Sequence, residues 1–118
     1  MKSQLRRYTA FGSLDVSSHV FQTGGLMIDD EKKVITVDKQ AVHLTPVQYK
    51  ILKLLTANTG RVFTIEEIYE KVWNESAVNP ENTVAVHIRK IREKIEINPK
   101  EPRYLKVVWG VGYKVEKY

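Results

Sequence analysis

The chain contains no cysteine and no hydrophobic run of the length that a membrane-spanning helix needs. The missing cysteine excludes a disulfide framework and thiolate-ligated metal sites. Hydrophobic residues make up 42% of the 118 residues, in short groups, and no secretory signal pattern opens the chain. We therefore expect one globular domain with a modest core, and these absences fit a cytoplasmic location.

Histidine is also scarce, and its three copies, His19, His43 and His87, lie far apart in the sequence. No serine stands in a nucleophile-elbow context. The carboxylate groups at 29–31 and 66–67 are explained by a turn and by a helix N-terminus. No spacing of His, Asp and Glu suggests metal ligation. We expect no enzyme, no catalytic residue, no bound metal and no cofactor.

Acidic residues are in the minority, 14 against 19 Lys and Arg, which gives a net charge of +5. The excess is concentrated in one segment. Residues 82–114 contain eight Lys and Arg against three Glu, so this segment carries the whole net charge. A basic balance confined to one segment is typical of a protein that binds a polyanion.

The centre of this basic segment, residues 82–95, has the periodicity of an amphipathic helix. Its apolar stripe consists of Val84, Ile88, Ile91 and Ile95. At about 100° per residue, the opposite side carries Val86, Arg89, Lys90 and Glu93, with Thr83, His87 and Lys94 nearer the edges. A face that mixes cations, a hydroxyl, an imidazole and small apolar groups suits the major groove of DNA. An ordinary solvated surface is the alternative explanation.

Capping boxes predict two further helices before this one. Residues 45–48, Thr-Pro-Val-Gln, begin a helix that we expect to end near Gly60, with the glycine in the left-handed position after the helix. Residues 64–67, Thr-Ile-Glu-Glu, begin a second helix that ends near Trp73. The third helix, over about 80–97, lies between two Asn-Pro pairs, the first suited to starting a helix and the second to ending one.

Short β-rich segments flank the helices. Residues 26–29, 34–37 and 41–44 alternate with polar turns and predict an antiparallel meander of three or four strands. Residues 104–116 predict a hairpin around the Gly-Val-Gly sequence at 110–112, with both glycines expected at positive φ. The fold class is therefore α+β, with an N-terminal antiparallel sheet, three helices and a C-terminal hairpin.

Three helices followed by a hairpin form a winged helix-turn-helix. Three blocks of this sequence resemble the DNA-binding domain of the OmpR/PhoB family of two-component response regulators. The blocks are 44–55, beginning Leu-Thr-Pro, then 84–95, and 108–114, Val-Trp-Gly-Val-Gly-Tyr-Lys. Their order and spacing fit the family from about residue 24 to 117, and the last block is similar to the VanR-like branch.

The resemblance also divides the chain. Residues 1–20 resemble the end of the family's receiver domain and the linker that follows it, and residues 21–118 form the winged-helix effector domain. The receiver domain itself, with its phosphoacceptor aspartate, is absent from this sequence. We expect residues 1–20 to be at most loosely docked.

The resemblance implies that the helix at 80–97 lies in the major groove of double-stranded DNA, with the wing at 104–116 on the adjacent minor groove and backbone. The residues at base-facing positions are Ala85, Val86 and Lys90. Those at phosphate-contacting positions are Trp73, Asn82, Thr83, His87, Arg89, Arg92 and Tyr113. Packing in the core or hairpin is the alternative role for Trp73 and Tyr113.

The turn of the wing holds Trp109, Gly110 and Gly112. Some relatives have an arginine at the position of Trp109 and insert it into the minor groove. An indole cannot replace that cation, so we expect more of the specificity to rest on Ala85, Val86 and Lys90.

The resemblance implies three partnerships besides DNA. These are RNA polymerase through the loop at about 74–80, a histidine kinase acting through the receiver domain, and a second copy on repeated half-sites, the isolated domain being monomeric. A winged helix that binds protein or RNA is the alternative class. The distinguishing feature is whether the third helix turns its cations outward together with Val86.

Overall fold

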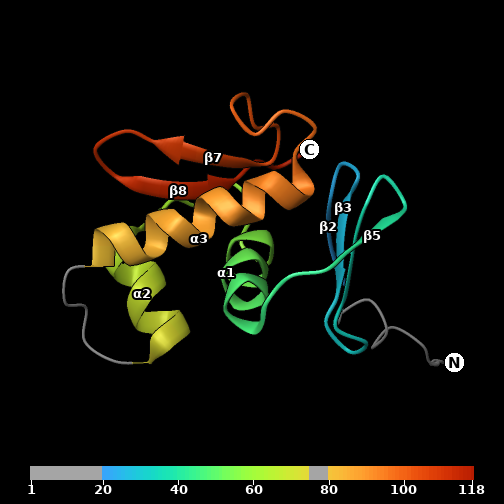
Figure 1. Ribbon diagram of the computed structural model, residues 1–118, viewed down its shortest axis with the longest axis horizontal. Helices are drawn as coiled ribbons and strands as arrows, with labels where there is room; N and C mark the ends of the chain where they lie inside the picture. Colours follow the sequence, from blue (N-terminus) through green and yellow to red (C-terminus); the bar gives the residue numbers. More distant parts are fainter. Residues whose placement is uncertain (1–19, 75–79) are drawn as a thin grey trace, which may run out of the picture.

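The computed structural model describes residues 20–74 and 80–118. The expectations for residues 1–19, and for the loop at 75–79, lie outside these ranges. In the described part an N-terminal sheet, three helices and a C-terminal hairpin follow one another, which confirms the predicted order and fold class (Figure 1). None of the described helices is long and apolar enough to cross a membrane.

The N-terminal sheet is an antiparallel meander in the order β2-β3-β4-β5. Its strands are β2 (Val20–Thr23), β3 (Leu26–Asp29), β4 (Val34–Val37) and β5 (Gln40–Val42). The first strand begins at the last residue assigned to the linker and was not predicted as a strand. β5 ends two residues earlier than expected. Leu26, Ile28 and Ile35 are buried against the helices, so one face of this sheet completes the core.

Helix α1 (Pro46–Thr56) begins with the predicted capping box. The Gln48 amide donates to the Thr45 hydroxyl at 3.2 Å, and the Thr45 amide donates to the Gln48 side-chain oxygen at 3.2 Å. The expected role of Gly60 is wrong, because the helix ends at Thr56. Gly60 has a φ of +84° further along the chain, where its amide donates to the Val115 carbonyl at 2.8 Å.

One acidic side chain fastens α1 to the first sheet. The Tyr49 hydroxyl donates to Asp30 Oδ1 at 2.5 Å, and Lys33 and Lys53 form ion pairs with the same carboxylate at 3.0 and 3.2 Å. The Tyr49 hydrogen bond, followed by the lysines, holds the pKa of Asp30 well below its usual range. Burial and this carboxylate raise the pKa of Tyr49, so its hydroxyl stays protonated.

Helix α2 (Ile65–Trp73) has a second capping box, in which the Glu67 amide donates to the Thr64 hydroxyl at 3.0 Å. Its C-cap, Asn74, is left-handed with a φ of +59°. Helix α3 (Pro80–Ile95) follows, and the predicted stripe Val84, Ile88, Ile91 and Ile95 is buried against α1 and α2. It ends two residues before the expected position.

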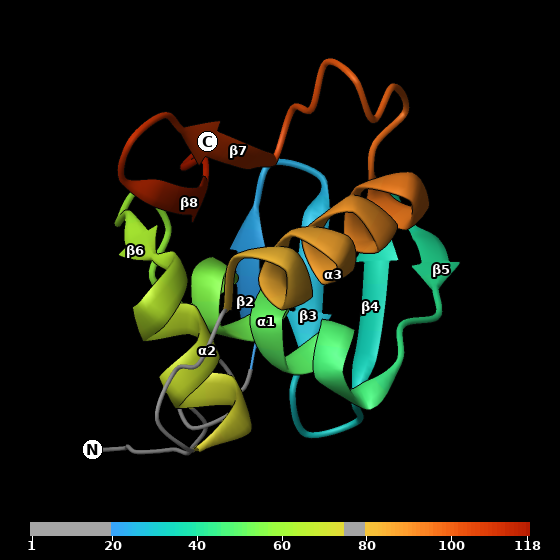
Figure 2. The same ribbon diagram turned by 60° about the vertical axis from the view of Figure 1, so that its left-hand side comes forward.

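The wing consists of β7 (Leu105–Val108) and β8 (Gly112–Val115), with the short β6 (Phe63–Thr64) paired to β8. Figure 2 shows this small sheet on one side of α3 and the four-stranded sheet behind α1. Gly110 has the expected positive φ of +78°. The same expectation for Gly112 is wrong. A Cβ there would collide with the Phe63 carbonyl oxygen, so this position needs glycine for the close approach of β6.

Candidate nucleic-acid interface

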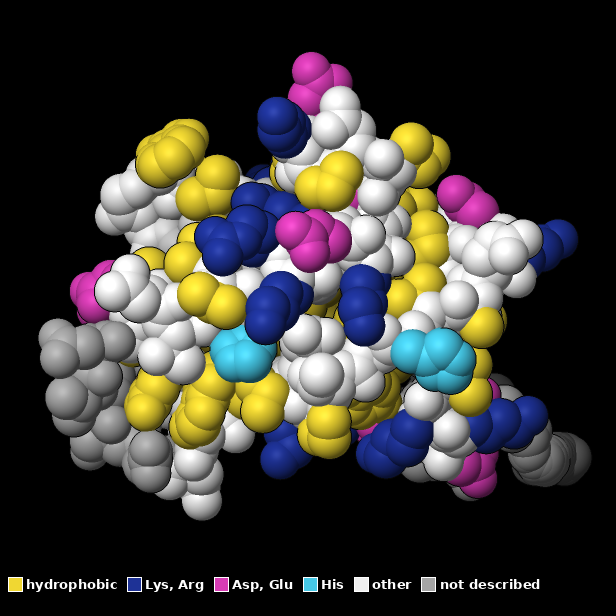
Figure 3. Space-filling view, in the orientation of Figure 1, with side chains coloured by type: hydrophobic (Ala, Val, Ile, Leu, Met, Phe, Trp, Pro, Cys, Tyr) yellow, Lys and Arg dark blue, Asp and Glu magenta, His cyan; other side chains and the backbone are white. Residues whose placement is uncertain are grey.

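The side of α3 opposite its buried stripe carries exposed cations. Arg89 and Lys90 are exposed, while Ala85 and Val86 beside them are half-buried. Figure 3 shows Lys and Arg side chains gathered along the course of α3, with hydrophobic and histidine side chains between them. The cations therefore face outward together with a small apolar surface. This arrangement is the feature that distinguishes a DNA-binding winged helix from one that binds protein or RNA.

An aromatic row supports the first half of this face. The rings of Tyr69 and Trp73 on α2 stack with centroids 4.8 Å apart, and Trp73 meets His87 of α3 at 5.6 Å. Trp73 is half-buried between its two neighbours, so its packing role is established by geometry. The spacing of four residues from Tyr69 to Trp73 was the available signal, since such pairs lie on one helix face.

The imidazole of His87 completes this row. Burial, and then repulsion from Lys90, lower the pKa of its imidazole below the usual value. Its Nδ1 is buried without a hydrogen-bond partner among the described residues. The ring is therefore neutral at physiological pH, and an anion placed beside it would favour its protonation.

Arg92 joins α3 to the wing. Its Nε donates to the Leu105 carbonyl at 3.0 Å, and its guanidinium carbon lies 5.9 Å from the centroid of the Tyr113 ring. Both Arg92 and Tyr113 are half-buried as a result. The structure thus brings two predicted phosphate-contacting residues together and gives each an internal packing role as well.

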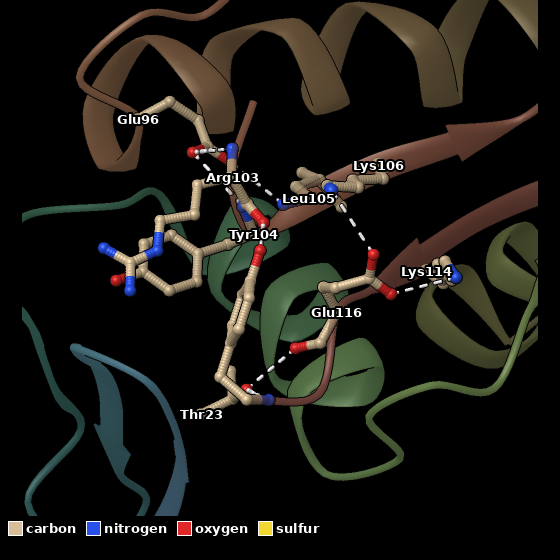
Figure 4. Close-up of polar contacts among 9 residues, drawn as sticks. Thr23, Glu96, Arg103, Tyr104, Leu105, Lys106, Lys114 and Glu116 are labelled. Carbon is tan, nitrogen blue, oxygen red and sulfur yellow. Dashed lines mark hydrogen bonds and ion pairs between the residues drawn. The ribbon is translucent and has the colours of Figure 1, made fainter. Parts of the chain in front are cut away.

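The cations of the wing strands are paired internally. Lys106 and Lys114 face each other across the hairpin, and both form ion pairs with Glu116, at 3.3 and 2.9 Å (Figure 4). These pairs lower the pKa of Glu116, Lys114 having the larger effect. Trp109, at the turn, is 88% exposed. The tip of the wing therefore presents an indole, and the two nearest strand cations share one carboxylate, which offsets one of their two charges.

The buried carboxylate of Glu96 fixes the start of the wing. It accepts the backbone amides of Arg103, Tyr104 and Leu105 at 2.7, 3.0 and 2.8 Å (Figure 4). Sequence reasoning counted Glu96 only as a negative charge. Glu96 falls inside the helix expected over 80–97, and no local pattern indicates which amides its carboxylate contacts.

The predicted site residues fall into three groups. Asn82, Arg89 and Lys90 are exposed on α3, whereas Thr83, Ala85, Val86, His87 and Arg92 on α3, with Trp73 and Tyr113, are half-buried around it. In the wing, Trp109 and Gly110 are exposed at the turn, and Gly112 is buried. No three His, Cys, Asp or Glu side chains are grouped to hold a metal ion in the part of the chain that the structure describes.

The sequence is similar to those of known transcriptional regulators. Residues 39–115 match the family described as "Transcriptional regulatory protein, C terminal". The chain is 37% identical to the regulatory protein VanR of Enterococcus faecium over 119 residues, covering 99% of this chain and 52% of VanR. It spans about half the length of the curated relatives it matches. Since differently named regulators are 34% to 39% identical to this chain, the VanR-like branch stays a prediction.

Solved structures of response regulators also superpose on this chain. The response regulator DrrB of Thermotoga maritima, an OmpR/PhoB homologue, superposes with a TM-score of 0.76 at 35% identity, over 83% of this chain and 44% of DrrB. The DNA-binding domain of the response regulator AdeR, solved in complex with an intercistronic region, superposes with a TM-score of 0.69 at 28% identity, over 82% of this chain and 99% of that domain. The chain therefore belongs to this family of transcriptional regulators, as an OmpR/PhoB-type response-regulator DNA-binding domain and not an enzyme.

Proposed function

We propose that this domain binds double-stranded DNA sequence-specifically by placing α3 in the major groove. The outward face of α3 carries the proposal, because it sets two exposed cations, Arg89 and Lys90, beside the small apolar side chains of Ala85 and Val86. Cations can donate to phosphates and to guanine, and small apolar groups can contact a thymine methyl. A protein- or RNA-binding winged helix would not need this combination on one helix face.

Within this function, Ala85, Val86 and Lys90 are the proposed base-contacting residues. Contacts to phosphates are proposed for Trp73, Asn82, Thr83, His87, Arg89, Arg92 and Tyr113. The exposure of Lys90 and Arg89 supports their assignment. The proposed phosphate contacts of Arg92, Trp73 and Tyr113 would be made by side chains that also pack inside the domain. Phosphate contacts fix register and affinity, and base contacts select the sequence.

The larger context is also proposed. The domain acts as the output of a two-component response regulator in the cytoplasm, controlled by a histidine kinase through a receiver domain. Two copies bind repeated half-sites, while the isolated domain is monomeric. The loop at about 74–80 contacts RNA polymerase. The resemblance to the family supports these assignments, and the match to VanR and DrrB over nearly all or most of this chain agrees with them.

Selection of DNA from a random pool, followed by binding measurements at several salt concentrations, tests the proposal. We expect enrichment of one short repeated motif, bound more tightly than random DNA, with log affinity falling linearly against log salt. A domain that binds the enriched DNA no better than random DNA at every salt concentration lacks the proposed function.

A further inference from the structure

A hollow lies between the N-terminal sheet and α1, away from the proposed DNA interface. Its volume is about 430 Å³, which falls within the range of about 300 to 1,000 Å³ that is usual for small-ligand pockets. His43 and Leu44, which line it, belong to the connection that runs from β5 to α1 (Figure 1). Its other walls come from β4, β5 and α1, so the hollow uses none of the residues proposed to contact DNA.

The floor of this hollow is apolar. Ile35 of β4 and Val42 of β5 are paired across the two strands, so their side chains share one face of the sheet. Leu44 and the ring of Tyr49 extend the same surface, and both are half-buried. Covering this floor with the apolar part of a ligand would be favourable, because it removes apolar surface of both molecules from water.

The rim of the hollow is basic. Three lysines line it, Lys33, Lys50 and Lys53. The ammonium groups of Lys33 and Lys53 are held by Asp30, at 3.0 and 3.2 Å from its carboxylate oxygens. That single carboxylate offsets one of their two charges, and Lys50 forms no ion pair within the described residues. The rim therefore keeps an excess of positive charge.

The hydrogen-bond acceptors around the rim are already occupied. The carboxylate of Asp30 accepts the Tyr49 hydroxyl as well as the lysines, and the carbonyl oxygen of His43 accepts Lys94 Nζ at 2.9 Å. The nearby carboxylate of Asp29 accepts backbone amides of the turn that follows it. The rim thus offers a ligand chiefly ammonium donors, which match an anionic group.

We propose that this hollow binds a small amphipathic carboxylate, with the apolar body on the floor and the carboxylate at the lysine rim. The inference goes beyond the proposed DNA binding and does not depend on it, since it uses other residues. Charge complementarity selects an anion, and the apolar floor selects one with a hydrocarbon body. The volume of the hollow favours a small molecule over an acidic segment of another protein.

The test titrates the domain with octanoate and follows its backbone amides by NMR at constant ionic strength, below the concentration at which octanoate forms micelles. Butanoate and octanol are the matched probes, the first with a shorter body and the second without a charge. We expect shifts confined to the lining segments, residues 33–35, 42–50 and 53. Octanoate should bind more than about tenfold more tightly than butanoate, because each buried methylene strengthens binding by about two- to fourfold. It should also bind about fivefold more tightly than octanol.

Two substitutions separate the role of the rim from that of the floor. Lys50→Gln should weaken octanoate by about two- to fivefold, the range of an exposed ion pair. Lys100→Gln removes the same charge from an exposed lysine outside the hollow and should leave the affinity unchanged. Val42→Trp should fill the floor and abolish binding. Thermal melting shows whether Val42→Trp stays folded, and the exposed lysine variants should melt like the wild type.

Several results would overturn the proposal. Equal affinities for octanoate and butanoate would remove the role of the floor. Equal affinities for octanoate and octanol, or equal weakening by Lys50→Gln and Lys100→Gln, would remove the role of the rim. If an amphipathic peptide rich in Glu and Leu shifts the lining amides and octanoate does not, the occupant is a protein segment and the small-molecule site is wrong.

Discussion

Arg92 Nε donates to the carbonyl oxygen of Leu105 at 3.0 Å, so a cation of the third helix holds the first residue of the wing in place. The guanidinium also lies over the Tyr113 ring, which keeps it half-buried. Arg92, which is expected to contact phosphate, therefore also fixes the position of the wing relative to the third helix. Its substitution should affect both stability and binding.

We expect Arg92→Ala to lower the free energy of unfolding by about 1 to 2 kcal/mol, because it leaves the Leu105 carbonyl without its partner. Its affinity for selected and random DNA should fall by similar factors. Urea unfolding and salt-dependent binding measure the two effects. Arg89→Ala is the matched control: Arg89 is exposed, so stability should change by less than about 0.5 kcal/mol while affinity falls. Equal destabilisation by both variants contradicts the assigned role of Arg92.

Lys90→Ala should relax sequence preference instead. Loss of a base contact costs about 1 to 3 kcal/mol on the preferred DNA and less on other sequences. A second selection with the variant should therefore show one position of the motif degenerate. Arg89→Ala should select the wild-type motif with lower affinity. Identical motifs for the wild type and Lys90→Ala remove Lys90 from the base-contacting set.

The helices were predictable because their signals are local. In each capping box the hydroxyl of Thr45 or Thr64 meets an amide three residues away, so adjacent sequence specifies the contact. The buried stripe of α3 likewise repeats within the helix itself. The outward position of Arg89 and Lys90 followed directly from that stripe, which is why their exposure was predicted correctly, while their contacts with DNA stay a prediction.

The rest of the site depends on contacts between distant segments. The Thr23 hydroxyl donates to the Glu116 carbonyl at 2.8 Å across a separation of 93 residues, and no local pattern encodes that meeting (Figure 4). The same reason explains the error at Gly112. The turn chemistry suggested positive φ, whereas the requirement comes from the backbone of Phe63, which packs against it from another part of the chain.

The two glycines of the wing should differ when replaced by alanine. At Gly112 a Cβ would strike backbone atoms of β6, which cannot move aside as a side chain can. We expect Gly112→Ala to destabilise the domain by several times the effect of Gly110→Ala, which costs about 1 to 2 kcal/mol for a left-handed residue in open space. Thermal or urea unfolding of both variants measures the ratio, and equal effects would show that β6 yields.

His87 should make stability and DNA binding depend on pH in opposite directions. Its folded pKa lies below the ordinary value of 6.5, so on acidification the unfolded chain takes up a proton that the folded chain resists. The free energy of unfolding therefore falls as pH drops through about 6.5 towards the folded pKa. A neighbouring DNA phosphate would raise that pKa, so affinity should rise over the same interval.

The measurement compares the wild type with His87→Gln between about pH 7.5 and 5.5, below the usual range of lysine and above that of carboxylates. On acidification the free energy of unfolding should fall more for the wild type than for His87→Gln. The rise in DNA affinity should be absent from the variant. If His87→Gln shows the same rise in affinity, phosphate contact by His87 is excluded as its cause.

Asp30 should stabilise the domain at neutral pH. The Tyr49 hydroxyl and two lysines favour its ionised form and depress its pKa, so its contribution is present above the ordinary value of 3.8 and is lost as pH falls towards the folded pKa. We expect Asp30→Asn to lower the free energy of unfolding by about 1 to 2 kcal/mol at neutral pH. The gap should narrow on acidification below 3.8.

Tyr49→Phe is the matched variant, since it removes the hydroxyl and leaves the carboxylate with its lysines. Its effect should be smaller than that of Asp30→Asn, and the double variant should show that the two are not additive. Additive effects would mean that the hydroxyl and the carboxylate act independently.

The three amides held by Glu96 have a consequence for the lifetime of a DNA complex. Because the carboxylate already satisfies the amides of Arg103, Tyr104 and Leu105, the wing keeps its place before any DNA arrives. Binding then requires no slow ordering of this segment, so the domain should associate with different DNA sequences at similar rates. Discrimination between them should lie in how long each complex persists before it dissociates.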